Sequence, residues 1–102
     1  MRAFGLFKGL PYGDCNEDIS DYMEFKNDIP KDKILEHIES DAVEKWYTSF
    51  SSKDIFSGEK IESGKLVDGN FVFSMEFFHY YKNYDIGIPY EYEEYLKGIL
   101  GY

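Results

Sequence analysis

The fold is decided by residues 54–74, which read DIFSGEKIESGKLVDGNFVFS. Within this stretch the pair Asp68-Gly69 lies between two apolar runs. An Asp-Gly pair in that position is the strongest short-range signal for a β-hairpin with a two-residue turn. The sequence therefore predicts antiparallel strands near residues 60–67 and 70–74.

Two short helices are predicted ahead of this hairpin. The first covers residues 31–39, where Pro30 marks the start and apolar side chains recur on one face. The second covers residues 40–50, with Ser40 or Asp41 as its cap. Its expected buried face follows the spacing i, i+3, i+4, i+7 and consists of Val43, Trp46, Tyr47 and Phe50.

Two more helices are predicted after the hairpin. Ser74 is expected to cap one that ends at Asn83, and Pro89 to open the last. Because residues 3–7 add only a short strand, helices and strands are segregated along the chain, which is typical of an α+β fold. We expect a small single domain over residues 1–102, with two N-terminal helices, a central antiparallel hairpin and two C-terminal helices.

The net charge of −9 is concentrated in two short stretches. Residues 14–28 contain six carboxylates and one lysine, residues 85–94 contain four carboxylates and no cation, and the rest of the chain is balanced. Acid beside tyrosine is typical of a surface that binds a basic partner, because carboxylates pair with Arg or Lys while a ring fills a pocket. The expected contact residues are Asp14, Glu17, Asp18, Asp21, Tyr22 and Glu24 in the first stretch and Tyr90, Glu91, Tyr92, Glu93 and Glu94 in the second.

Each acidic stretch also has a simpler interpretation. Residues 14–28 could be a solvated loop that keeps a small protein soluble. In residues 85–94, acids in the first turn of a helix are stabilised by the helix dipole, by about 0.3–1 kcal/mol each. The sequence leaves the binding interpretation and the simpler one open for both stretches.

The composition excludes several classes of partner. Binding to nucleic acid or to an anionic membrane requires a surplus of Lys and Arg, so neither is expected. The first residues, MRAFGLFKGLPYGD, are too short and too interrupted for a secretory signal, and no run approaches the length of a membrane span. With a single cysteine, these features favour a reducing, cytoplasmic location.

Tests for catalysis and metal binding are negative. His37 and His79 are expected to be partly exposed helix residues, and the acids around Cys15 disfavour its thiolate. Residues 14–18 place Asp, Asn and Asp at the first three ligand positions of a calcium loop, but Ile19 stands where the loop needs glycine. We therefore expect no enzyme, no cofactor and no metal, with a weak calcium-binding module as an alternative.

Residues 54–102 resemble small acidic bacterial immunity-type proteins of contact-dependent or polymorphic toxin systems. The resemblance rests on a Gly-Glu turn, the Asp-Gly hairpin, a Phe-Ser step and the segment YYKNYDIGIPYEY at residues 80–92. It implies an immunity protein that occludes the active site of a basic bacterial toxin domain, above all a nuclease. A nuclease must be positively charged to hold phosphates, so an acidic surface can mimic its substrate. The alternative is a non-catalytic acidic structural or interaction domain with another partner.

Overall fold

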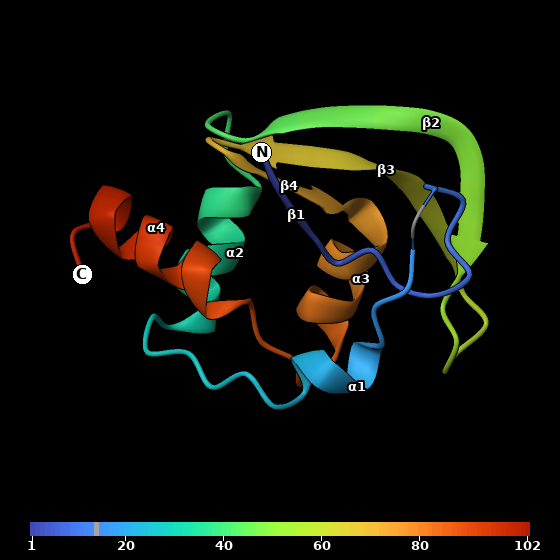
Figure 1. Ribbon diagram of the computed structural model, residues 1–102, viewed down its shortest axis with the longest axis horizontal. Coiled ribbons are helices and arrows are strands. Elements are labelled where there is room, and N and C mark those ends of the chain that lie inside the picture. The colour runs from blue at the N-terminus through green and yellow to red at the C-terminus, as the bar shows by residue number, and fades with distance from the viewer. Residues whose placement is uncertain (14) are drawn as a thin grey trace.

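The computed structural model describes residues 1–13 and 15–102. These residues form a four-stranded sheet and four helices, which confirms the α+β class. In Figure 1 the helices lie below the sheet. The elements in chain order are β1 (Arg2–Phe4), α1 (Ile19–Tyr22), α2 (Lys31–Ile38), β2 (Glu44–Lys53), β3 (Lys60–Asp68), β4 (Phe71–Ser74), α3 (Met75–Asn83) and α4 (Tyr90–Leu100).

The predicted hairpin is confirmed as the centre of a larger, mixed sheet. The strand order is β1-β4-β3-β2, with β3 antiparallel to both of its neighbours. Gly69 makes the tight turn between β3 and β4 with a positive φ of 58°, a conformation that glycine adopts without strain. The first strand pairs parallel to β4, with Phe4 opposite Phe73, so it closes the other edge from far away in the sequence.

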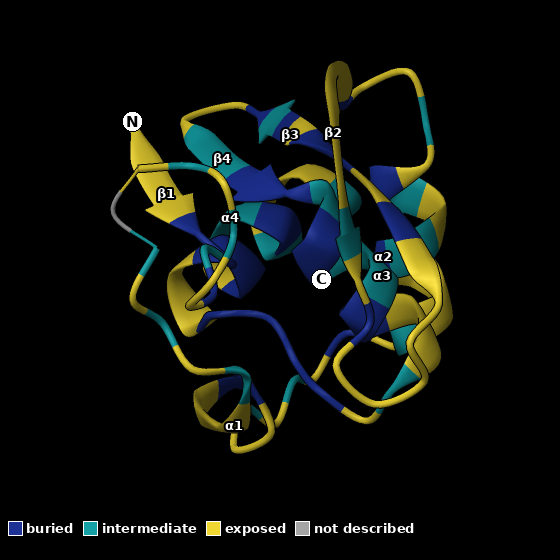
Figure 2. Cartoon of the chain, turned by 90° about the vertical axis from the view of Figure 1, so that its right-hand side faces the viewer, coloured by how far each residue is buried: buried dark blue, intermediate teal, exposed yellow. Residues whose placement is uncertain are grey.

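The predicted helix over residues 40–50 is wrong, because most of this segment belongs to the edge strand β2. Trp46, Tyr47 and Phe50 are not a buried stripe: their exposed fractions are 62%, 66% and 60%. Figure 2 shows this exposure along nearly all of β2. Aromatic residues and threonine favour strands, and here pairing with β3 outweighs the helical spacing.

Aromatic rings supply much of the core between the sheet and the helices. Phe4 stacks on Phe73 with ring centroids 4.8 Å apart and meets the edge of Phe77 at 5.2 Å. The ring of Tyr92 from α4 packs 5.2 Å from Phe4. Each such ring buries on the order of 150–250 Å². A three-residue strand is therefore enough to place one large side chain at the centre of the fold.

A buried polar network lies where the register of β2 on β3 shifts, midway along β2. The hydroxyl of Tyr12 donates to Glu76 at 2.8 Å and accepts the N–H of Gly64. The Glu76 carboxylate is fully buried and also accepts hydrogen bonds from the hydroxyls of Ser52 and Ser63. Burial and the bond to Glu76 raise the pKa of Tyr12 to about 12, so its hydroxyl keeps its proton at neutral pH.

The three other predicted helices are present in the structure. α2 matches the helix expected over residues 31–39, and α3 begins after Ser74 and ends at Asn83 as predicted. The side chain of Ser74 accepts the N–H of Phe77 at 2.9 Å, which is the expected cap. Within the described part of the chain, no helix combines the length and apolarity needed to cross a bilayer.

Gly5, which directly follows β1, packs closely against α3. Its φ is 70°, and a Cβ there would lie 2.5 Å from the Cβ of Phe77. We predict that Gly5→Ala lowers the free energy of unfolding by about 3 kcal/mol or more, because a left-handed backbone and a clash act together. Gly9→Ala is the matched control: φ is 88° but nothing lies within 4 Å, so the loss should be about 1–2 kcal/mol. Equal losses in urea denaturation would contradict the close packing.

Candidate protein-binding surface

The first acidic stretch enters α1, a single helical turn that Asp18 caps. Its carboxylate accepts the backbone N–H of Ser20 at 3.0 Å and the Ser20 hydroxyl at 2.9 Å. These two hydrogen bonds lower the pKa of Asp18 below its usual value. Asp18 is exposed, so its carboxylate caps α1 and is also accessible to a partner.

Glu17 and Tyr22 hold α1 against the N-terminal loop. Glu17 accepts the N–H of Leu6 at 2.9 Å and the hydroxyl of Tyr22 at 2.7 Å. The Tyr22 hydroxyl in turn accepts the N–H of Gly5 at 2.7 Å. Tyr22 is only 2% exposed, and burial together with the bond to Glu17 raises its pKa far above the usual value. Its burial removes Tyr22 from the expected contact residues, and Glu17 has a structural role.

The two acidic stretches meet at Glu93. This residue is only 4% exposed, and its carboxylate accepts the backbone N–H of Asp28 at 2.6 Å and that of Ile29 at 3.2 Å. The Asn27 side chain also bridges to the other stretch: it donates to the Ile88 carbonyl at 3.1 Å and accepts the Ile88 N–H at 2.9 Å. The loop after α1 is therefore fixed to the start of α4.

Two of the expected contact residues in the second stretch are internal. Tyr92 is fully buried and donates its hydroxyl to Asp68 at 2.6 Å, while Glu93 serves the loop contacts described above. Burial and the bond to Asp68 raise the pKa of Tyr92 far above its usual value. Neither side chain is available to a partner in this structure, which corrects the expectation that both lie on the surface.

The expected residues that stay exposed, together with Asp28 of the first stretch, are called the acidic surface. Asp14 lies outside the described residues. Ring contact joins the two stretches here, because Phe25 meets the half-exposed Tyr90 edge-on with centroids 5.1 Å apart. The acidic surface consists of Asp18, Asp21, Glu24, Asp28, Tyr90, Glu91 and Glu94.

Some acids of the acidic surface form ion pairs and others do not. Glu91 pairs with Arg2 at 3.4 Å, and Asp28 and Glu94 share Lys97 at 3.2 Å and 3.5 Å. Of the five residues in these pairs, all but Lys97 lie largely in solvent, so each pair stabilises the fold by little, typically below about 1 kcal/mol. Within the described residues, Asp21 and Glu24 form no ion pair and are the freest acids.

Both histidines belong to structural networks. Nε2 of His37 lies 2.7 Å from the carboxylate of Asp68, which is the last residue of β3. The same carboxylate accepts a hydrogen bond from the hydroxyl of Tyr92. His79 lies 2.7 Å from Asp54, the residue that opens the β2–β3 turn. Both histidines are partly exposed, as expected, but sequence patterns did not reveal their pairing with buried aspartates, because the members of each pair are far apart along the chain.

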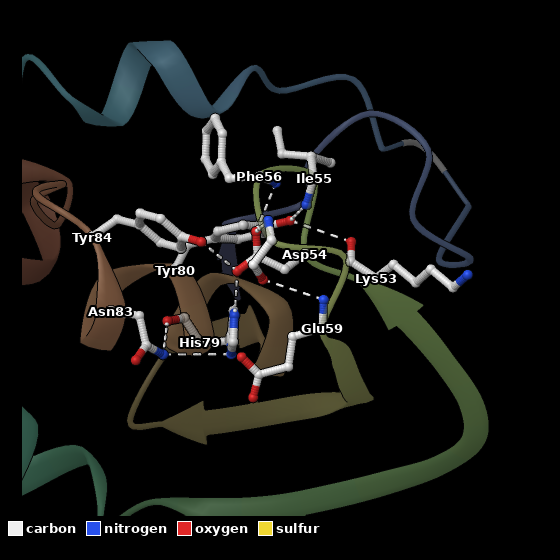
Figure 3. A network of polar contacts seen from close by, with 10 residues as sticks. Lys53, Asp54, Ile55, Phe56, Glu59, His79, Tyr80, Asn83 and Tyr84 are labelled. Atoms are coloured by element: carbon white, nitrogen blue, oxygen red, sulfur yellow. Dashed lines mark hydrogen bonds and ion pairs between the residues drawn. The ribbon is translucent and has the colours of Figure 1, made fainter.

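Asp54 organizes the β2–β3 turn (Figure 3). Its carboxylate accepts the N–H groups of Phe56 at 2.8 Å and Ser57 at 3.1 Å, and the hydroxyl of Tyr84 at 2.7 Å. Burial alone would raise the pKa of Asp54. The hydrogen bonds from His79, Tyr84 and the two backbone amides outweigh it and hold the pKa well below the usual value.

A groove of about 450 Å³ borders the acidic surface. Its apolar lining includes Leu10, Ile19, Phe50 and Ile55, and Asp18 and Lys53 are among its charged residues. Among residues 1–13 and 15–102, no group of three or more His, Cys, Asp or Glu side chains is arranged to hold a metal ion. The site can therefore offer carboxylates and apolar contacts to a partner.

Comparison with known proteins adds no relative. The chain matches no protein-family model, no curated protein and no solved structure.

Glu93 provides a test of how the acidic surface is built. We predict that Glu93→Gln lowers the free energy of unfolding by about 2 kcal/mol, because a neutral amide replaces a charged acceptor of buried N–H groups. Glu94→Gln removes the same charge from the exposed neighbouring position and should change stability by less than about 0.5 kcal/mol. Urea denaturation of both variants makes the comparison. Equal stabilities would show that Glu93 does not hold the two stretches together.

The lowered pKa of Asp54 predicts how the stability of the fold depends on acid pH. Its folded pKa is below the ordinary value of 3.8, so the stability it contributes is present above that pH and is lost as the pH falls further. The difference in unfolding free energy between the wild type and Asp54→Asn should be constant near neutral pH and shrink below about pH 4. Glu59→Gln, an exposed carboxylate of the same turn, is the control. A difference that stays constant through the acid range would contradict the lowered pKa.

Proposed function

We propose that this chain is a bacterial immunity protein that binds a basic toxin domain, a nuclease, and occludes its active site with the acidic surface. The observation that carries the proposal is the convergence of two distant acidic stretches around the half-exposed ring of Tyr90. Asp21 and Glu24, which no cation neutralises among the described residues, supply the freest charge. The resemblance of residues 54–102 to immunity-type proteins points to the same class.

The side chains suited to catalysis favour inhibition by binding over an enzymatic reaction. His37 and His79 are each engaged by a buried carboxylate. Cys15 donates its thiol to the carbonyl of Tyr12 at 3.0 Å. Glu76 is buried among hydroxyls that support the strand pairing. Each of these groups has a structural role in the fold, whereas the acids of the acidic surface are exposed.

The proposed mechanism is electrostatic competition. A nuclease holds phosphates with Lys and Arg, and the carboxylates of Asp21 and Glu24 can pair with those cations in place of phosphate. The rings of Tyr90 and Phe25 supply a flat apolar contact at low conformational cost. Opposite charges also steer the encounter, so the association rate should exceed the neutral range of about 10⁵–10⁶ M⁻¹s⁻¹ and fall as salt is added.

Charge reversal of the freest acids tests the proposal. We predict that Asp21→Lys with Glu24→Lys weakens binding to the cognate toxin domain by about 2 kcal/mol or more, mainly through lost charge pairs. Neither side chain forms a hydrogen bond or ion pair within the described part of the chain, so the fold should be unaffected. The test partner is to be identified by a search for a basic toxin reading frame immediately upstream of this one, and calorimetry then gives the dissociation constant.

The control carries the same change of charge elsewhere. Glu36→Lys with Asp41→Lys reverses two exposed acids outside the acidic surface, and binding should weaken much less. Matched losses in the two double variants would indicate a general effect of net charge. Full affinity of the Asp21/Glu24 variant would contradict the assigned surface. If the chain binds no toxin domain at all, the immunity role is wrong.

A further inference from the structure

The groove beside the acidic surface lies between the end of β2 and the loop that leads into α1. Its most buried lining residues are Phe7 and Tyr80, which are 6% and 4% exposed and whose ring centroids lie 5.9 Å apart. Leu10 and Ile19 line it on the loop side. Its volume of about 450 Å³ falls within the range of about 300–1,000 Å³ that is typical of binding pockets. The groove is therefore large enough, and apolar enough, to receive a side chain of a partner.

Two large apolar side chains on the β2 side of the groove remain in solvent. Phe50 and Ile55 are 60% and 68% exposed. Phe50 lies where the register of β2 shifts, and the Ser52 hydroxyl holds the strand there by donating to the buried Glu76 carboxylate at 2.7 Å. The N–H of Ile55 donates to the hydroxyl of Tyr80 at 3.0 Å (Figure 3). Hydrogen bonds inside the fold therefore hold the backbone that carries both exposed side chains.

Hydrogen bonds also fix the opposite side of the groove. The N–H of Lys8 donates to the carbonyl of Glu17 at 2.9 Å, and the N–H of Glu17 donates to the carbonyl of Leu6 at 3.1 Å. Ile19 is the first residue of α1 and directly follows the Asp18 cap. Binding costs less conformational entropy when both sides of a groove are ordered beforehand.

The charge of the groove differs from that of the acidic surface. Its charged lining residues are Lys8, Glu17, Asp18 and Lys53, two of each sign. Glu17 is engaged inside the fold by the hydroxyl of Tyr22, whereas Asp18 is exposed and also belongs to the acidic surface. The groove therefore continues the acidic surface at Asp18 but offers mainly apolar contact.

The neighbouring charge selects the kind of occupant. The charged members of the acidic surface, which borders the groove, are all acids. A second copy of this chain, with its own charge of −9, is repelled there, whereas a basic partner is attracted. A Lys or Arg of such a partner can pair with Asp18 while a neighbouring apolar side chain enters the groove. An anchor side chain seated in a pocket is typical of a binding hot spot.

We propose that the groove binds an apolar side chain of the toxin domain, beside a Lys or Arg that pairs with Asp18. This inference rests on the proposed function and adds to it a contact that does not depend on charge. The interface then extends from Tyr90 across α1 to the end of β2. In Figure 1, α1 lies at the bottom, with the start of α4 to its left and the end of β2 to its right.

Variants of the groove test the proposal with the toxin domain of the upstream reading frame. Phe50→Ser and Ile55→Ser should each raise the dissociation constant by about tenfold or more. Because neither variant removes a charge, the salt dependence of binding should stay that of the wild type, unlike that of the charge-reversed variant. The matched controls are Trp46→Ser on β2 and Ile99→Ser on α4, which are 62% and 50% exposed and lie outside the groove. Both controls should leave the affinity unchanged.

A dipeptide tests the groove without any toxin. N-acetyl-leucyl-arginine amide, added at millimolar concentration to methyl-labelled protein, should shift the NMR signals of the Ile19 and Ile55 methyl groups and leave those of Ile99 in place. N-acetyl-glycyl-arginine amide, which lacks the apolar side chain, should shift none of them. Asp18→Asn keeps a side chain that caps a helix and should weaken binding of the leucyl dipeptide about threefold, because the charge pair is lost.

The outcomes separate this inference from the proposed function. Toxin binding that the groove variants leave intact, or that the controls weaken equally, overturns the inference, while loss of binding on charge reversal still supports the acidic surface. If no toxin domain binds, the proposed function is wrong. In that case, or if a groove variant fails to fold by circular dichroism, the dipeptide decides. Ile19 and Ile55 signals that stay unchanged, or that respond equally to the glycyl dipeptide, overturn the groove as a binding site.

Discussion

The acidic surface depends on one buried carboxylate. Glu93 is buried and accepts the N–H groups of Asp28 and Ile29. These hydrogen bonds fix a loop of the first acidic stretch to a helix of the second. A buried charge is costly unless hydrogen bonds satisfy it, and here backbone amides and the Asn27 side chain supply them. The neighbouring acids Asp28 and Glu94 stay exposed.

Buried carboxylates that accept several hydrogen bonds occur at three other points of the fold. Asp54 orders the β2–β3 turn, Asp68 joins the hairpin to α2 and α4, and Glu76 supports the shifted register of β2. Each of these carboxylates is buried and surrounded by hydroxyl, imidazole or amide donors. A small core made largely of rings has few aliphatic side chains with which to lock its segments together. Buried acids with several donors perform that task.

Local signals in the sequence predicted what neighbouring residues determine. The Asp68-Gly69 turn and the Ser74 cap require only adjacent residues, and both were correct. The helix over residues 40–50 was wrong because its apolar spacing did not reveal that β3 would pair with this segment, or that Trp46 would remain in solvent. The sequence also did not predict that β1 pairs parallel to β4, because the two strands are some seventy residues apart.

For the acidic surface, charge counting found two stretches that contact each other in the structure, but it did not tell exposed side chains from buried ones. It could not separate the internal Tyr92 and Glu93 from their exposed neighbours, because burial depends on contacts between distant segments. The most direct test of the account is hydrogen exchange of the whole chain, alone and mixed with the toxin domain proposed as its partner. We expect new protection at residues 18–28 and 90–94. Protection confined to other segments would contradict the assignment of the acidic surface as the binding site.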